Sequence, residues 1–489
     1  MSPAKYIKIT PKILSSNVFL LTVLWILTTG LIFYRLNVPQ TTVFDETYFI
    51  PAAQKYLNGV FFLENHPPLG KLLIAAGEAI YSKGQNRLDF ITVDTITQDW
   101  PKDFDITGFR VAPALFGTFI PLILFLILNK LVNDRWLSFG FALLLAMDTA
   151  FLMQARIAML DVFLLFFIFL SILIFLYIFN KERVNSKVIS LLCILGVVSA
   201  CSANIKDTGL IVLVLPALIL LKLLIRKTPK VLIVGGIYVA VFLSTYLALW
   251  EIHFSIANVI MNNRDYGISE THRETLTNQR ENITWVDKFA GQLSEALRYT
   301  VEYNKAVPPL KLGDPQEIGS PWYYWPFGGT AIDYRWETPD GIHYQYSYLL
   351  GNPVTWLISL MGVILGTSTV ISDLLFRFLP KDKLKTSLYI FIALYWCYII
   401  PFWFINRVMY LYHYLPAMVL GLILMALLLS IIVQNKPKLK ISLLITMIVS
   451  VGILFILLKP FIYYESLTHA AFNARNIWPL WQLKWAGKK

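Results

Sequence analysis

The sequence is dominated by long apolar runs, each of a length that crosses a lipid bilayer as one helix. Because a helical span needs about 20 apolar residues, a window of about 19 residues predicts about eleven spans. They lie near 17–35, 111–131, 136–154, 158–179, 188–204, 208–225, 231–254, 353–375, 387–405, 409–433 and 441–462. The chain is 57% hydrophobic and 15% charged, whereas soluble domains contain about a quarter charged residues. We therefore expect an all-α polytopic membrane protein.

Positive charge is concentrated in alternate connections between these runs. If the N-terminus is cytoplasmic, every inside connection is basic, as the positive-inside rule requires. The inside connections carry Lys130, Arg135, Lys181, Arg183, Lys187, Lys222, Arg226, Lys227, Lys230, Arg377, Lys381, Lys383, Lys385, Lys436, Lys438 and Lys440. Topology therefore explains the net charge of +12, and the expected partner is the lipid bilayer, with no nucleic acid. The first run lacks a following cleavage site, so we expect an uncleaved first helix.

The outside connections divide the chain into three parts. We expect an N-terminal transmembrane catalytic module over 1–254 that includes a first extracytoplasmic loop at 36–110. A large extracytoplasmic loop follows at 255–352, then a C-terminal transmembrane module and outside tail at 353–489. Apolar residues at helical spacing between Pro68 and Tyr81 predict an amphipathic helix in the membrane interface. The large loop lacks strand alternation, which favours a loop with short helices over a folded domain.

Two adjacent acids, Asp45 and Glu46, stand just after the first predicted span. Further along the same loop, the segment 66–71 has two prolines, which fix an extended approach, followed by Gly and Lys at a helix start. His66 and Lys71 are therefore expected near the interface, on the same side as the acids. An ordinary solvated charge at a helix end is the competing interpretation of the acidic pair.

Isolated cations occupy or border the short outside connections, where charged groups at membrane depth tend to mark a site. They are Arg110, Arg156, Lys206 and Arg407. Four cations facing two acids could hold an anionic lipid phosphate beside a carboxylate base, and Arg binds phosphate oxygens in a bidentate manner. Each cation alone could equally be a flanking residue or belong to an ion pair, such as Arg156 with Asp161 or Lys206 with Asp207.

The histidines do not form a metal-binding pattern. Six are present, and none shows the spacing of a metal-ligand motif, so neither a metal nor another cofactor is predicted and a divalent cation stays optional. His413 is predicted about a turn and a half inside the tenth span, where it could touch a phosphate or satisfy a neighbouring helix. No Gly-rich phosphate loop or nucleophile elbow is present, which argues against nucleotide use and against a serine hydrolase.

Several motifs are specific only in combination. They are Phe44-Asp45-Glu46, His66-Pro67-Pro68-Leu69-Gly70-Lys71, Arg110 ahead of Ala114-Leu115-Phe116-Gly117, Gln154-Ala155-Arg156-Ile157 to Leu160-Asp161, Ile252-His253-Phe254, Gly351-Asn352-Pro353, and Arg407 with Leu411-Tyr412-His413-Tyr414-Leu415-Pro416. Together they resemble the motifs of the protein O-mannosyltransferase family, in order from the first helix to the tail.

This resemblance implies a GT-C membrane fold and an enzyme that transfers mannose from a polyprenyl-phosphate-mannose donor to Ser or Thr hydroxyls of translocated polypeptides, with inversion. It implies Asp45 as general base with Glu46 as its acidic neighbour. It implies Arg110 as the ligand of the donor phosphate. The further substrate-binding candidates are Arg156, Lys206, Arg407, His413, His66, Lys71 and Asp161.

The large loop departs from the eukaryotic members of that family, which carry a soluble repeat domain there. The range 255–352 is too short for such a domain, which suits a bacterial-type member in the plasma membrane. An extracytoplasmic active site and an association with the secretion machinery are the corresponding expectations.

Two other functions remain open on the sequence alone. A related GT-C enzyme could act on a lipid or cell-wall glycan acceptor, with the same donor chemistry and a different acceptor groove. A transporter or lipid flippase would also carry intramembrane charges. Against transport, the charges cluster at the outer boundary rather than the midplane, and the sequence shows no inverted repeat.

Overall fold

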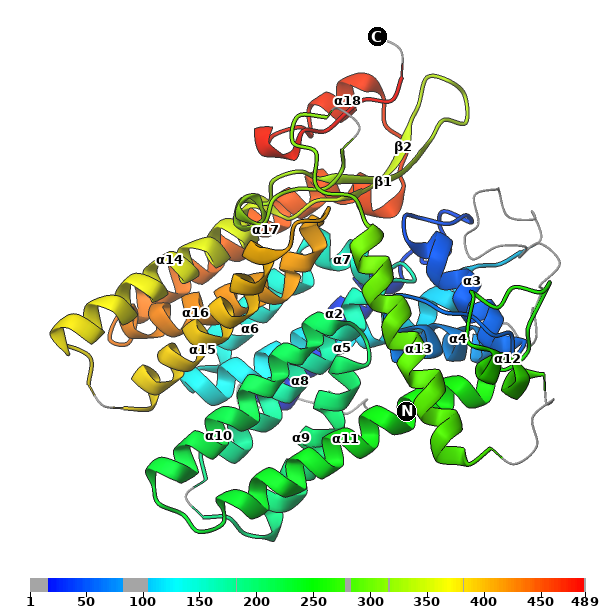
Figure 1. Ribbon diagram of the computed structural model, residues 1–489. Coiled ribbons are helices and arrows are strands. Elements are labelled where there is room, and N and C mark those ends of the chain that lie inside the picture. The colour runs from blue at the N-terminus through cyan, green and yellow to red at the C-terminus, as the bar shows by residue number, and fades with distance from the viewer. Residues whose placement is uncertain are drawn as a thin grey trace, which may run out of the picture.

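The chain folds into a bundle of long helices with a smaller assembly of short helices and one hairpin at one end (Figure 1). The structure, a computed structural model, describes residues 16–487 apart from 82–103, 182, 278–282, 315–316 and 381. Part of the expected first loop, 82–103, therefore lies outside the described residues. Within the described part, the elements that the sequence places in outside loops gather at a single end of the bundle (Figure 1).

Nine helices in the described ranges are long and apolar enough to cross a bilayer. They are Thr107–Val132 (α5), Asp161–Phe179 (α8), Ser186–Ala203 (α9), Asp207–Ile225 (η1 and α10), Val231–Ile256 (α11), Pro353–Phe376 (α14), Lys383–Phe404 (α15 and η3), Leu411–Ile432 (η4 and α16) and Pro437–Tyr463 (α17). The bent pair Arg135–Ala146 (α6) and Thr149–Ala155 (α7) forms a tenth span, and the 17-residue helix Asn17–Phe33 (α2) covers the first predicted run. Each predicted run thus coincides with a helix, and the polytopic helical class is confirmed.

The third predicted run is broken where the sequence pattern suggested a straight helix. Helices α6 and α7 meet at 64°, because Asp148 caps the N-terminus of α7 by accepting from the amide of Phe151. The same carboxylate accepts from the amide of Asn352 and the indole of Trp356 at the start of α14. A buried acid with three donors therefore interrupts the span and ties the two halves of the chain together.

The outer faces of the bundle have the character of lipid-facing surface. Helix α11 is only 11% buried and α17 only 17% buried over their most apolar windows, and their exposed side chains include Leu232, Ile233, Ile445 and Ile453. An apolar surface of this extent on a water-soluble protein would drive aggregation. Its presence identifies the bilayer as the solvent of these helices.

The remaining elements pack beside one end of the bundle. They are α3 (Glu46–Leu57), α4 (Leu69–Tyr81), α12 (Glu270–Leu276), α13 (Trp285–Ala306), η2 (Trp322–Phe327), β1 (Ile332–Glu337), β2 (Gln345–Leu349), α18 (His469–Asn473) and η5 (Pro479–Trp481). Helix α4 matches the predicted amphipathic segment, and its buried face packs on α5 and α3.

The expectation of only short helices and no strands between 255 and 352 is wrong. Helix α13 has 22 residues, and the apolar residues of its packed face, Phe289, Leu293, Ala296 and Tyr299, recur at helical spacing that the interpretation of the sequence overlooked. Strands β1 and β2 pair antiparallel, with an irregularity between Asp333 and Arg335. This irregularity breaks the alternation by which a strand is recognised.

Helices α14 and α16 approach closely at two glycines. A Cβ added at Gly362 would overlap the carbonyl oxygen of Gly421, and one added at Gly421 would overlap Ser359. Ser359 donates a hydrogen bond to the carbonyl of Met418 across the same contact, at 2.8 Å. Small residues of this kind let membrane helices approach and form interhelical hydrogen bonds.

We predict that Gly362→Ala lowers the free energy of unfolding by roughly 1–3 kcal/mol, because the added methyl group forces α14 and α16 apart. The matched control is Gly236→Ala in α11, where an added Cβ meets nothing within 4 Å. Thermal unfolding of the detergent-solubilised proteins measures the difference. Equal transition temperatures for the two variants would contradict close packing at Gly362.

Candidate active site

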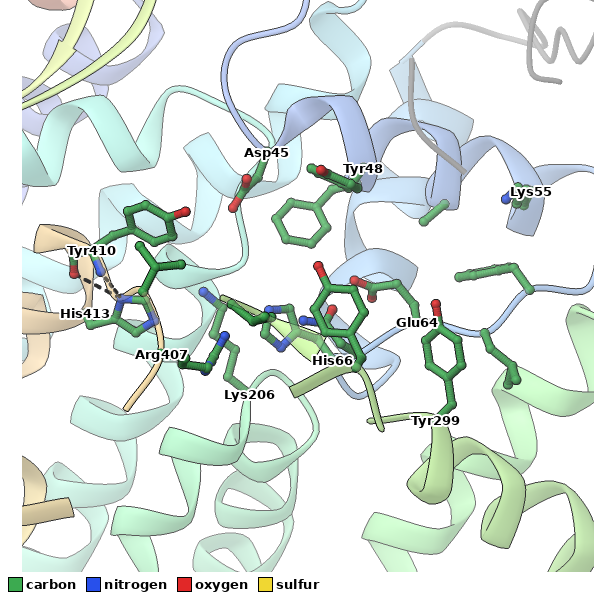
Figure 2. A pocket seen from close by; sticks show the side chains of 18 of the residues that line it. Asp45, Tyr48, Lys55, Glu64, His66, Lys206, Tyr299, Arg407, Tyr410 and His413 are labelled. Atoms are coloured by element: carbon green, nitrogen blue, oxygen red, sulfur yellow. Dashed lines mark hydrogen bonds between the residues drawn. The ribbon is translucent and has the colours of Figure 1, made fainter. Parts of the chain in front are cut away.

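A cavity of about 540 Å³ lies beside the bundle, where α3, α13 and the loops before α4 and α16 meet (Figure 2). It is lined by Asp45, Tyr48, Phe49, Ala52, Lys55, Phe62, Leu63, Glu64, Asn65, His66, Lys206, Arg264, Tyr299, Tyr303, Val307, Arg407, Val408, Tyr410, Tyr412 and His413. Five of the residues singled out from the sequence therefore line one cavity. They are Asp45, His66, Lys206, Arg407 and His413.

The carboxylate of Asp45 points into this cavity (Figure 2). Its backbone carbonyl accepts from the amides of Tyr48 and Phe49 at the start of α3. Within the described ranges its side chain makes no hydrogen bond or ion pair. Burial raises the pKa of Asp45 from 3.8 to about 7, with Lys206 opposing the shift and neighbouring acids adding to it. A carboxyl group with such a pKa can exchange a proton near neutral pH.

Glu46, its neighbour, is fully buried and faces away from the cavity lining. Its two carboxylate oxygens accept from Nε and Nη2 of Arg110 at 2.8 and 2.7 Å, and from the amides of Val43 and Ala158 at 2.8 and 2.7 Å. A carboxylate that accepts four hydrogen bonds has no free lone pair for a substrate proton. Glu46 therefore fixes the turn that presents Asp45.

Arg110 does not lie where the sequence interpretation expected it. Its guanidinium is fully buried, and the N–H groups not used by Glu46 donate to the carbonyls of Leu36, Pro39 and Thr41. All five N–H donors of the side chain are thus occupied. The expectation that Arg110 holds the donor phosphate is corrected accordingly, because it instead holds the chain between α2 and α3.

Arg156 is also occupied by the polypeptide. It donates to the carbonyls of Ile32, Tyr34 and Arg35 at 2.5, 2.5 and 2.9 Å, and so caps the C-terminal end of α2. Its guanidinium lies over the ring of Tyr463, 4.5 Å from the centroid. Neither the phosphate-binding expectation nor the alternative pairing of Arg156 with Asp161 fits these contacts.

Lys71 is buried beneath the loop that carries His66. Its ammonium forms an ion pair with Glu64 and donates to the carbonyl of His66 at 2.6 Å. Lys71 does not belong to the cavity lining, whereas Glu64 does. Its contacts therefore shape the wall of the cavity, in place of the expected direct substrate contact.

Lys206 and Arg407 are the cations of the cavity wall that lies near Asp45 (Figure 2). Lys206 donates to both carboxylate oxygens of Asp161 at 2.9 Å, so its partner is Asp161 rather than Asp207, and Asp161 acts on the site through it. Arg407 forms no ion pair or hydrogen bond within the described ranges. Its guanidinium is therefore free to receive an anion.

Two imidazoles complete this wall. The backbone of Tyr410 holds the ring of His413, since Nδ1 lies 3.0 Å from the carbonyl oxygen and 3.4 Å from the amide nitrogen of that residue. His413 lies in the 3₁₀ turn Leu411–Tyr414 that opens the span Leu411–Ile432, before α16 begins at Leu415, and so nearer the end of the span than predicted. Burial and nearby cations hold the pKa of His66 well below its usual value.

A second cavity of about 500 Å³ adjoins the first. The two share His66, Lys206, Val307, Arg407 and His413 in their linings. The rest of the second lining combines apolar Ile405 and Met409 with the polar side chains of Asp207, Thr208, Asn304, Lys305 and Asn406. The shared cationic groups therefore border both a chamber that contains Asp45 and this second chamber.

Sequence reasoning missed much of the remaining lining. Tyr299 and Tyr303 come from α13, a helix that the interpretation of the sequence overlooked, although their spacing of four residues is helical. Tyr410 and Tyr412 shortly precede the expected residue His413, and their rings stack at 5.6 Å between centroids. In the described residues, no group of three or more His, Cys, Asp or Glu is arranged to hold a metal ion.

We predict that substitution of Arg110 lowers stability much more than substitution of Arg407. Arg110→Leu leaves Glu46 as an unpaired buried charge and should lower the free energy of unfolding by roughly 3–5 kcal/mol. Arg407→Leu removes a cation that has no partner among the described residues and should leave stability nearly unchanged. Thermal unfolding in detergent compares them, and a folded Arg110→Leu protein of parental stability would refute the structural role of the pair.

Two family models match the chain. The model for dolichyl-phosphate-mannose-protein mannosyltransferase matches residues 22–261, and that for the C-terminal four TMM region of protein-O-mannosyltransferase matches residues 291–481. The chain is 30% identical to protein O-mannosyl-transferase 2 of Danio rerio over 258 residues, which is 49% of this chain and 33% of that protein. It is 28% identical to the Homo sapiens protein O-mannosyl-transferase 1 over 186 residues, or 37% and 24% of the two chains. The matches thus span a quarter to a third of these relatives.

The fold is also that of a solved structure, described as S. cerevisiae protein O-mannosyltransferase Pmt1-Pmt2 complex bound to the sugar donor. The TM-score is 0.82 at 16% identity, over 96% of this chain and 93% of that chain. This likeness concerns the fold and confirms the expected polytopic GT-C architecture. On the two family models and the relatives together, the chain belongs to the protein O-mannosyltransferase family.

Proposed function

We propose that the chain is an inverting glycosyltransferase that moves mannose from a polyprenyl-phosphate-mannose donor to Ser or Thr hydroxyls of polypeptides. The observation that carries this proposal is the position of Asp45, which faces the cavity wall formed by Lys206, Arg407 and two histidines. A base and an anion-binding wall that face one space are the parts that a single displacement at an anomeric carbon requires.

Asp45 is the general base of the proposed reaction. The acceptor hydroxyl donates its proton to Asp45 while its oxygen attacks the anomeric carbon of mannose. The carboxylate makes no hydrogen bond or ion pair with the described residues, so its lone pairs are open to a substrate. Its raised pKa makes it a stronger proton acceptor than a solvated carboxylate.

The departing lipid phosphate is stabilised by Arg407 and Lys206. Arg407 has an unoccupied guanidinium, which suits bidentate binding of phosphate oxygens. Lys206 shares its charge with Asp161, which also holds the ammonium at a fixed position. Nε2 of His413 and the ring of His66 lie in the same wall. Because the leaving group already carries negative charge, these groups can support departure without a protonating acid.

The chamber around Asp45 suits a polypeptide acceptor. Tyr48, Tyr299 and Tyr303 line it, together with Glu64 and Lys55. Tyrosine rings offer broad contact surface with a polar tip, which adapts to peptides of varied sequence. The neighbouring chamber, which shares the cationic wall and reaches Ile405 and Met409, is the proposed position of the donor's polyprenyl chain.

The proposed orientation places this site on the extracytoplasmic side of a bacterial plasma membrane, with the N-terminus in the cytoplasm. The support is the charge distribution, since the basic connections lie at the other end of the bundle from Asp45. A translocated polypeptide emerging from the secretion machinery would meet the site on this side.

The direct test is incubation of the purified protein with polyprenyl-phosphate-mannose and a Ser/Thr-rich peptide, followed by mass spectrometry of the peptide. Addition of one hexose to the peptide supports the proposal. Donor consumption with hexose appearing on a lipid or glycan acceptor, and none on the peptide, would favour the alternative acceptor class. Transfer by protein in detergent, without a closed membrane, excludes transport as the only activity.

We predict that Asp45→Asn lowers the transfer rate by roughly 10²–10⁴-fold, the usual contribution of a general base. The protein should remain folded, because the side chain has no partner among the described residues. Glu302→Gln is the control, since this exposed acid lies beside Tyr303 on α13 without facing the cavity. Normal turnover by purified Asp45→Asn protein would rule out this base.

The pH dependence of transfer has a predicted sign. Asp45 must be ionised to accept a proton, and its pKa is about 7, so the rate should fall as pH decreases through 7. The lowered pKa of His66 keeps that ring neutral over the same range. Protonation of His66 should therefore cause no second change of the transfer rate near pH 6.5. A profile that stays flat between pH 5 and 8 with chemistry rate-limiting would contradict this assignment.

A further inference from the structure

A third cavity, of about 560 Å³, lies far from the proposed active site. It is bounded by the C-terminal ends of α8 and α10 and by the N-terminal end of α15, at the lower left of Figure 1. Helix α8 connects the two regions, since Asp161 at its start pairs with Lys206 and Phe179 at its end lines this cavity. Nineteen residues of helix separate them by about 28 Å, close to the thickness of the hydrocarbon core.

The lining of this cavity is cationic at one end. It contains Lys222, Arg226 and Lys383, against one lining carboxylate, Asp382. That carboxylate is already engaged, because it accepts from the amide of Lys385 and caps α15. The N-terminal end of a 17-residue helix adds the positive end of its macrodipole.

Two of these cations are held in place by the backbone. Lys222 lies over the ring of Phe179, 4.6 Å from the centroid, and donates to the carbonyls of Phe179 and Lys181. Lys383 donates to the carbonyl of Lys130 at the end of α5. Their ammonium groups are therefore positioned before any ligand arrives, which reduces the entropy lost on binding.

Besides the polar side chains of Asn180, Thr386 and Ser387, the rest of the lining is an apolar wall that opens toward the lipid. Leu221 and Ile225 line it and are 52% and 73% exposed on the bundle surface, where the bilayer covers them. Leu176, Leu218 and Ile390 extend the apolar wall. A ligand that fits must carry an anionic group at one end and hydrocarbon at the other.

We propose that this cavity binds the headgroup of an anionic phospholipid, with its acyl chains along the apolar wall. A topological excess of basic residues explains the sign of the charge on this side of the protein. It does not explain why three cations from two distant parts of the chain surround a cavity with one apolar wall. Basic pockets between transmembrane helices are suited to anionic lipid headgroups.

The test compares lipid binding by two double variants with matched charge. Arg226→Gln with Lys383→Gln removes two lining cations, whereas Lys227→Gln with Lys438→Gln removes two exposed cations at the same end of the bundle that do not line the cavity. Native mass spectrometry of the detergent-solubilised proteins, titrated with phosphatidylglycerol or with phosphatidylcholine, measures lipid retention. Thermal unfolding verifies that each variant is folded.

The parent and the control variant should retain phosphatidylglycerol in preference to phosphatidylcholine. The lining variant should bind phosphatidylglycerol about 25-fold more weakly, at about fivefold for each cation lost. Excess inorganic phosphate should not displace the lipid, because it makes no contact with the apolar wall. Equal losses in both variants, equal retention of the two lipids, or displacement by inorganic phosphate would each overturn the proposal.

Discussion

The ion pair between Glu46 and Arg110 is the interaction on which the proposed site depends. Arg110 in α5 ties together the carbonyls that follow α2 and the carboxylate at the start of α3. Glu46 also accepts from the amide of Ala158, which precedes α8. Burying two charges is costly unless every donor and acceptor is satisfied, and here all are. This network holds the turn at Phe44, whose φ is +52°, and so sets the direction of Asp45.

Charged groups in this protein therefore have two distinct roles. Arg110, Arg156 and Lys71 are occupied by backbone carbonyls or by a carboxylate, and they hold loops against the membrane helices. Asp45 and Arg407 keep their polar atoms directed at a cavity. The difference between the two groups is hydrogen-bond occupancy, since a saturated guanidinium cannot bind a phosphate and an open one can.

The sequence predicted the helices well and the roles of the charges less well. Apolar length alone locates a span, because the bilayer requires every backbone group to be satisfied within the helix. It did not reveal the bend at Asp148, where a local N-cap starts α7, and it could not reveal that the same carboxylate binds donors more than 200 residues away. Nor could it separate Arg110 from Arg407, since both are single arginines near an outer boundary and only their partners differ. Helix α13 was overlooked although Phe289, Leu293, Ala296 and Tyr299 recur at helical spacing on its packed face, because its polar residues gave the whole segment the character of a loop.

The central claim is that a donor phosphate lies on the wall formed by Arg407 and Lys206, with the sugar turned toward Asp45. A cryo-electron microscopy structure of the purified protein with bound polyprenyl-phosphate-mannose measures this directly. The account predicts that phosphate oxygens lie at hydrogen-bond distance from Arg407. It also predicts space beside Asp45 for an acceptor oxygen, roughly 3–3.5 Å from the anomeric carbon. A phosphate bound away from this wall, or a sugar on the side opposite Asp45, would contradict it.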